Sequence, residues 1–139
     1  MDIYHLFTLI AATLTGASMG SFLMVTLLYN THLKNKKNIN DSLFIYRRLY
    51  RLNSILCLIA GLCAALIKDH TATLMLTILT VSYVFNLSHI LKGLLKACDD
   101  QYNIINDRTH QSFTHLQNLL HLSQFAGAGY AIYLLALNY

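Results

Sequence analysis

The sequence predicts an all-α integral membrane protein, a four-helix bundle whose N-terminus and C-terminus both lie on the non-cytoplasmic side. Three observations predict this class. Only 12% of the residues are charged, about half the share in a typical soluble domain. Charge-free stretches of the chain are long enough to cross a bilayer. The lysines and arginines gather in two of the three loops, which indicates how the helices are oriented.

Four charge-free runs define the helices: residues 3–33, 52–67, 70–91 and 109–139. A membrane-spanning helix needs about 20 mostly apolar residues, so three of the runs qualify directly. The second run is shorter, but Leu49 and Tyr50 extend it, and the long side chains of Arg51 and Lys68 can reach the interface from its ends. We therefore predict one domain, residues 1–139, with helices at residues 4–29, 49–67, 71–93 and 114–137.

A soluble four-helix protein is the alternative to a membrane bundle. Its helices would show a charged or polar face every 3.6 residues. The segment "LMLTILTVSYVF" has only Thr, Ser and Tyr at such positions, and these hydroxyl groups can bond to their own helix backbone. The pattern favours lipid as the solvent of this chain.

The distribution of cationic residues predicts the orientation. Nine of the ten lysines and arginines fall in the loops around residues 30–51 and 92–108, and Lys68 alone lies in the loop between them. The side rich in Lys and Arg is normally cytoplasmic, so both termini should face away from the cytoplasm. We predict a multi-pass protein of the inner (cytoplasmic) membrane.

The segment "YRRLYRLN", residues 46–53, carries three of these cations directly before an apolar run. We interpret it first as an interfacial anchor on an amphipathic lead-in helix that is capped near residues 40–42. Tyrosines favour the interfaces of a membrane, so we expect Tyr46 and Tyr50 at the inner interface with Tyr29. The outer interface is expected to hold Tyr4, Tyr130, Tyr133 and Tyr139.

Composition excludes several classes of function. Glutamate is absent and all six aspartates lie outside the predicted helices, so a carboxylate proton relay or a buried carboxylate metal site is not supported. Cys57, Cys63 and Cys98 form no CxxC or zinc pattern. The net charge of +4 is explained by anchoring at the membrane and requires no nucleic acid.

Small residues indicate where helices approach one another. Ala12, Gly16 and Gly20 recur every four residues on the first helix. Such stripes allow close packing between membrane helices, where no hydrophobic effect drives association. The stripe predicts either a tight contact within the bundle or docking of the first helix on another membrane subunit, and both alternatives stay open.

Amide and imidazole groups are the candidate site residues of the predicted spans. Asn86 and His89 lie three residues apart on the third helix, and His115, Asn118 and His121 follow the same spacing on the fourth. All five positions are expected in the cytoplasmic half of the membrane. The plain interpretation is hydrogen bonding between helices, worth about 0.6 kcal/mol for each bond.

Facing histidines in a helical bundle also suit a b-type haem. On this hypothesis His89 and His121 are the iron ligands, with His115 as an alternative because it lies about 120° from His121 around the helix. Cationic side chains near the site would pair with the propionates. These are Arg47, Arg48, Arg51 and Lys92.

Several short motifs resemble the four-helix bacterial protoporphyrinogen oxidase family, which belongs with the copper-resistance-D-like membrane proteins. They are "LLYN" (residues 27–30), "RRLYR" (47–51), "IAGL" (59–62) and "SHILKGLLK" (88–96). The resemblance implies a four-helix fold and a haem or tetrapyrrole site. It does not imply the oxidase activity, because Asn30 replaces the family's ligand histidine, and Leu119 and His121 stand where the family has Glu and Pro after Asn118.

The leading functional hypothesis is a small inner-membrane protein that binds haem b or a related tetrapyrrole in its cytoplasmic half. One alternative is a non-catalytic accessory subunit of a larger membrane complex, bound through Ala12, Gly16 and Gly20. Another is a carrier of a small lipophilic molecule. Whether the protein is an enzyme is not decided by the sequence, since the accessory-subunit alternative is non-catalytic and the haem hypothesis leaves the reaction open.

Overall fold

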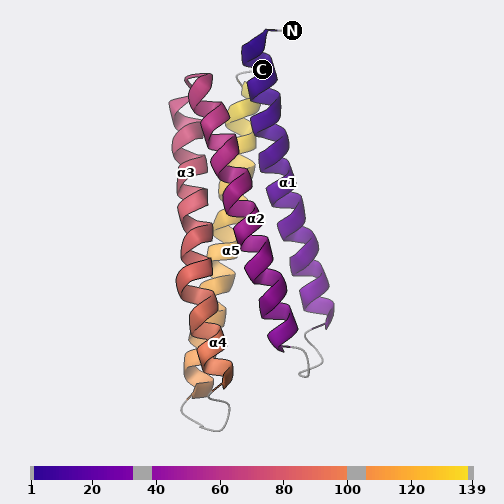
Figure 1. Ribbon diagram of the computed structural model, residues 1–139, viewed down its shortest axis with the longest axis vertical. Helices are drawn as coiled ribbons and strands as arrows, with labels where there is room; N and C mark the ends of the chain where they lie inside the picture. The colour runs from indigo at the N-terminus through magenta and orange to yellow at the C-terminus, as the bar shows by residue number, and fades with distance from the viewer. Residues whose placement is uncertain (1, 33–38, 100–105, 138–139) are drawn as a thin grey trace.

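A computed structural model of the protein describes the backbone of residues 2–32, 39–99 and 106–137, and the side chains of residues 2–27, 44–96 and 111–137. The described chain is all α-helical and forms a long four-helix bundle (Figure 1). Its elements are α1 (Ile3–His32), α2 (Ile39–Leu66), α3 (His70–Phe85), η2 (Asn86–Ile90), α4 (Leu91–Asp99) and α5 (Asn106–Leu137). Because α3, η2 and α4 follow one another without a break, they make up the third long helix.

The prediction of four helices that are long and apolar enough to span a membrane is confirmed. Each long helix contains a segment that is long and apolar enough to cross a bilayer: Ile3–Leu27, Phe44–Leu66, His70–Lys96 and Gln111–Leu137. Large apolar side chains cover the outside of the bundle, for example Leu122 at 69% exposure and Leu27 at 66%. A surface of this kind is suited to hydrocarbon rather than to water.

Three helices extend well beyond their predicted bounds, and α5 is one of them, because it begins at Asn106 and not at residue 114. The second helix begins at Ile39, so the expected lead-in helix and the membrane span form one continuous helix. No proline or glycine interrupts the chain between them. The third helix continues to Asp99 through the π-helical turn η2. The predicted cap at residues 40–42 concerns side chains outside the described residues.

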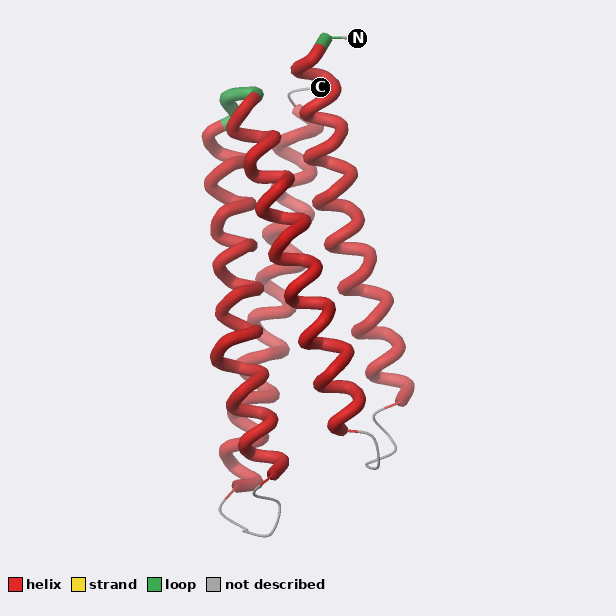
Figure 2. The backbone as a smooth tube through the Cα atoms, in the orientation of Figure 1, coloured by secondary structure: helices red, strands yellow, loops and turns green. Residues whose placement is uncertain are grey.

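The turn between α2 and α3 is short because both helix ends are capped locally (Figure 2). Lys68 adopts a left-handed backbone with φ of 61°. The N–H groups of Lys68 and Asp69 donate to the carbonyls of Ala65 and Ala64, at 3.0 and 3.1 Å, as in a Schellman motif. The Asp69 carboxylate in turn accepts from the N–H of Ala72 at 3.0 Å and caps α3. These bonds reduce the number of unpaired backbone N–H and C=O groups at the α2–α3 turn.

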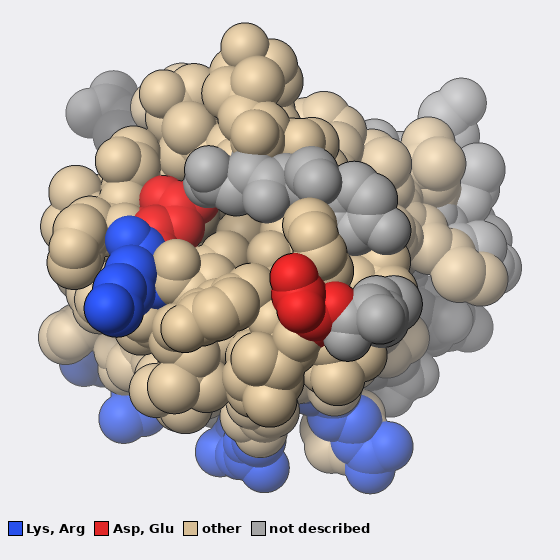
Figure 3. Space-filling view, turned by 90° about the horizontal axis from the view of Figure 1, so that it is seen from above, with Lys and Arg blue, Asp and Glu red and all other residues tan. Residues whose placement is uncertain are grey.

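The helices are arranged as a square, in which α1 and α3 each pack against α2 and α5. The pairs α1–α3 and α2–α5 therefore lie across the diagonals. We call the end where α1 begins and α5 finishes the terminal end, and the opposite end, with Arg47, Arg48, Lys92 and Lys96, the basic end. Figure 3 shows the terminal end covered mostly by uncharged side chains.

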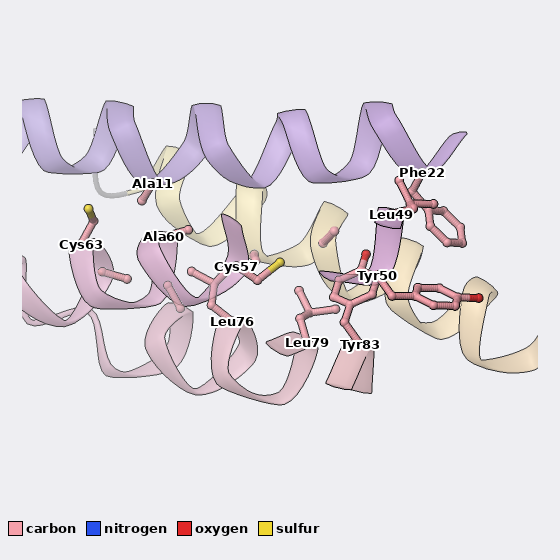
Figure 4. Packing of buried hydrophobic residues seen from close by; sticks show 14 of the residues in the cluster. Ala11, Phe22, Leu49, Tyr50, Cys57, Ala60, Cys63, Leu76, Leu79 and Tyr83 are labelled. Atoms are coloured by element: carbon pink, nitrogen blue, oxygen red, sulfur yellow. The ribbon is translucent and has the colours of Figure 1, made fainter. Parts of the chain in front are cut away.

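The core changes in character along the bundle (Figure 4). Small buried residues, including Ala11, Ala60 and Cys63, lie toward the terminal end, whereas Phe22, Tyr50 and Tyr83 lie toward the basic end. Small side chains allow helices to approach closely, and aromatic rings hold them apart. This agrees with Figure 1, where α1 and α2 diverge from α3 and α4 toward the basic end.

Candidate functional site

A cluster of buried and half-buried polar and aromatic side chains lies inside the bundle, displaced toward the basic end. Its polar members are neutral groups, and none of the charged side chains that the structure describes is buried. Polar groups at this depth are costly in hydrocarbon and often mark a functional site. The cluster consists of Ser18, Ser21 and Phe22 from α1, Tyr46, Tyr50, Asn53 and Cys57 from α2, Ser82, Tyr83 and Asn86 from α3 and η2, and Gln117, His121 and Gln124 from α5.

Tyr50 connects α2 with α5 across one diagonal of the bundle. Its hydroxyl group makes a short hydrogen bond with Nε2 of His121. The same hydroxyl accepts a hydrogen bond from Nε2 of Gln117 at 2.8 Å. A tyrosine hydroxyl can serve two partners because it has one donor hydrogen and acceptor lone pairs. One buried atom thus connects two side chains that lie one helical turn apart on α5.

Aromatic rings hold the imidazole of His121 in place. Phe22 meets it edge-on, with ring centroids 4.6 Å apart and an interplanar angle of 81°. Tyr46 stacks on it at 5.6 Å and 26°. The Tyr50 ring lies 5.8 Å from the imidazole and 6.4 Å from the ring of Tyr83. The rings of Phe22 from α1 and of Tyr46 and Tyr50 from α2 thus fix the orientation of His121.

A second polar group surrounds Asn53 at the junction of α1, α2 and α3. Ser21 Oγ donates to Asn53 Oδ1 at 3.0 Å, and Ser18 Oγ lies 3.6 Å from Cys57 Sγ. The Tyr83 hydroxyl lies close to Ser18 and Asn53, across the other diagonal of the bundle. Interhelical contacts between hydroxyl and amide groups are a common means of joining membrane helices.

One further bond sets the register of α3 against α5. Gln124 Nε2 donates to Ser82 Oγ at 2.7 Å. Because α3 and α5 run in opposite directions, one turn toward the basic end brings Asn86 on η2 to the level of His121 on α5. The two polar groups described above therefore belong to one interior region.

The structure separates the predicted site residues into two sets. His121 and Asn86 are buried inside the bundle, at 8% and 0% exposure. The remaining predicted residues are exposed: His89, His115, Asn118, Arg47, Arg48 and Arg51. His89 lies against the ring of Phe85 on the surface, at 4.9 Å between centroids, and the Arg48 guanidinium lies 4.5 Å above the ring of Phe44. The structure does not bring these exposed groups together with His121.

Two interpretations of the sequence are corrected by this geometry. Tyr46 and Tyr50 were expected at the membrane interface but are buried in the core, because they lie on the opposite face of α2 from the exposed arginines. On α5 the inward positions are Gln117, His121 and Gln124, at spacings of four and three, rather than a strict three-residue series. The signal for Gln117 was available in the sequence as the four-residue spacing to His121.

The described residues fit a haem only in part. A haem held between two histidines needs both imidazoles to face one interior space. His121 faces inward, with Nε2 bonded to Tyr50, whereas His89 and His115 are exposed. Among the described residues, no group of three or more His, Cys, Asp or Glu side chains is placed to hold a metal ion. Haem binding stays a prediction. Of the three histidines proposed as iron ligands, only His121 faces the interior.

A separate cleft of about 460 Å³ opens at the terminal end, between the start of α1 and the α2–α3 turn. Its lining mixes aromatic, imidazole and charged groups: Tyr4, His5, Thr8, Ile67, Lys68, Asp69, His70 and Thr71. The wide opening and its position at the expected membrane surface distinguish it from the buried cluster. Tyr4, Tyr130 and Tyr133 are exposed at this end, as the sequence predicted for an interface.

Comparison with known proteins finds no matching family model, no matching curated protein and no matching solved structure. The resemblance to the protoporphyrinogen oxidase family is thus limited to short motifs. The structure itself shows an all-α protein with four helices that are long and apolar enough to span a membrane.

Proposed function

We propose that this small multi-pass membrane protein is a non-catalytic subunit of a membrane complex, and that it binds its partner through the glycine face of α1, formed by Gly16 and Gly20. The observation that carries the proposal is the open space above both residues. A Cβ atom added to either glycine would have no other atom within 4 Å, apart from its local helix backbone. In the sequence these residues are separated by three others, the spacing of a common dimerisation motif of membrane helices.

The orientation of α1 supports this assignment. The helix buries one stripe against its own bundle, made by Thr8, Ala11, Thr15, Ser18 and Phe22. Ala12 lies at the edge of that contact, Gly16 is half-buried, and Gly20 is exposed. Neither glycine is therefore needed for helix packing within this chain. Because glycine weakens a helix by roughly 0.5–1 kcal/mol relative to alanine, two outward glycines are most useful where another helix approaches closely.

The proposal is tested by replacing both glycines with leucine. In a mild detergent we expect the wild-type protein to migrate as a complex larger than its 15.7 kDa chain. The Gly16→Leu/Gly20→Leu variant should reduce the fraction in that complex by about tenfold or more, equivalent to at least 1.4 kcal/mol. The thermal midpoint of the monomer should stay the same or rise, because a Cβ at either position meets no other atom within 4 Å and leucine is a better helix former than glycine.

Ala65→Leu is the matched control, since Ala65 is an exposed small residue on α2. It should leave the complex intact. A wild-type protein that is monomeric from the start, or a double variant that migrates like the wild type, would overturn the proposal. A complex that contains only this chain would replace the accessory role with self-association.

A second proposal is the binding of a b-type haem or related tetrapyrrole in the half of the membrane near the basic end. Support comes from His121 in the interior and from the cationic residues at the same end. A protein purified without added haem should then show a Soret band that sharpens on reduction and disappears in His121→Ala. A flat spectrum from folded protein would end this proposal and leave the subunit proposal unaffected.

We also infer the orientation and location of the bundle. The basic end, which holds five of the six Lys and Arg side chains among the described residues, Arg51 included, would face the cytoplasm. Both termini would then lie outside the cytoplasm, with the protein in the inner membrane. Lys68 is the remaining described cation and lies at the terminal end.

A further inference from the structure

Asn86 combines complete burial with an amide group that has no hydrogen-bond partner. Its exposure is 0%, and both Oδ1 and Nδ2 are unpaired. Exchanging the two atoms by turning the amide over does not remove the problem, because neither position offers a partner. Buried polar groups are almost always hydrogen-bonded, and hydrocarbon cannot replace the missing bonds. This amide therefore indicates a partner that is not part of the chain.

Two other unpaired amide atoms come from neighbouring helices at a similar depth. They are Nδ2 of Asn53 on α2 and Oε1 of Gln124 on α5. At 1.5 Å per residue, all three side chains lie about 20–24 Å along their helices from the terminal end. The Gln124–Ser82 bond places Asn86 one turn beyond Gln124 in the register of α3 and α5. The Tyr83 hydroxyl, one turn before Asn86 on the same stripe, lies close to Asn53.

The backbone changes at the same position. Asn86 begins the π-helical turn η2, and its carbonyl accepts from the N–H of Leu91, five residues later. Such wide turns inside α-helices are frequent at functional sites. On the far side of the turn the buried positions continue at Ile90, Leu91 and Leu94. The turn thus shifts the inward face of the third helix just where the unpaired amide lies.

We propose that Asn86 belongs to an internal binding site for a neutral hydroxyl group, either a water molecule or the hydroxyl of a membrane-soluble molecule. The unpaired atoms include two amide donors and two amide acceptors, and a hydroxyl oxygen can both accept and donate. The absence of buried charge among the described residues favours a neutral ligand over an ion. The site is independent of the subunit proposal, because it lies in the interior and not on the glycine face.

The sign of one stability change tests the site. If nothing binds, Asn86→Leu removes an unpaired amide, and the thermal midpoint should rise or stay the same. If a hydroxyl ligand binds, the variant loses those bonds, and we expect the midpoint to fall by roughly 3–6 °C in detergent. Asn118→Leu is the matched control, because Asn118 is exposed on α5, and it should cause no fall.

A measurement on the wild-type chain distinguishes the two sources and does not depend on the variant folding. Magnetisation transfer from water to the Asn86 side-chain NH2, seen by NMR in micelles, would identify a bound water. A defined mass adduct on the wild-type chain in native mass spectrometry would identify a membrane-soluble molecule. Either result supports the site. A wild-type protein with neither signal, or an Asn86→Leu variant at least as stable as the wild type, overturns it.

Discussion

At the scale of single residues, the interior of the bundle depends on a few bonds that cross its diagonals. Tyr50 is the clearest case, since its hydroxyl joins His121 and Gln117 on α5 from α2. A bond across the diagonal needs long side chains, because the two backbones are not adjacent. Tyrosine, histidine and glutamine have that length and carry a polar group at the tip.

Tyr50→Phe should destabilise the protein, because it removes the hydroxyl group and leaves His121 Nε2 and Gln117 Nε2 without this partner. We expect the free energy of unfolding in detergent to fall by about 1–2 kcal/mol. The control is Tyr133→Phe, which removes a hydroxyl from a residue on α5 that is 58% exposed. Equal unfolding midpoints for the two variants would show that the Tyr50 hydroxyl contributes nothing to stability.

At the scale of elements, the third helix is adapted to its neighbours by a π turn and by one glycine. Gly93 lies on α4, where the ring of Phe113 from α5 covers it. A Cβ atom at this position would come within 2.5 Å of the Phe113 ring. A larger residue here would require the Phe113 ring to move, so this glycine contributes to the close approach of the two helices rather than to backbone flexibility.

Gly93→Ala should force the Phe113 ring away from α4. We expect a loss of about 1–3 kcal/mol in the free energy of unfolding, the usual range for overpacking. Gly129→Ala is the control, since a Cβ there meets nothing within 4 Å. It should be neutral or stabilising by up to about 1 kcal/mol, because alanine is the better helix former. If contact with the Phe113 ring causes this loss, Gly93→Ala should lower the free energy of unfolding by less in a Phe113→Leu background than in the wild-type chain.

At the scale of the whole molecule, charge and core shape follow the same axis. Five of the six described Lys and Arg side chains and the aromatic part of the core lie toward the basic end, while alanine and cysteine fill the core toward the terminal end. The exposed arginines of α2 lie on the outer face of the helix whose inner face carries Tyr46 and Tyr50. One segment thus carries both the exposed arginines and three members of the buried cluster, Tyr46, Tyr50 and Asn53.

Reporter fusions test the orientation of the whole bundle. Alkaline phosphatase fused to the C-terminus should be active, and a green fluorescent protein at the same place should be dark, if both termini lie outside the cytoplasm. The same reporters inserted between α1 and α2 should give the opposite pair of results. A fluorescent C-terminal fusion would mean that the positive-inside prediction is wrong for this chain.

The sequence by itself determined the solvent, the number of helices and the periodic positions of the polar groups. Its charge-free runs were sufficient because hydrocarbon tolerates few other structures, so four apolar segments predict four spanning helices. His121 and Asn86 were identified as candidate interior residues for the same reason, as polar groups within apolar helices.

Only the tertiary structure decided which faces of those helices meet. Tyr50 and Gln117 became part of the buried cluster because α2 and α5 turn these side chains toward the shared diagonal, whereas His89 and Asn118 face outward on equally apolar helices. In a membrane helix nearly every face is apolar, so the pattern of hydrophobic residues does not mark the inward side. The rotation of each helix about its axis is set by packing against the neighbouring helices. The sequence of one helix alone does not contain this information.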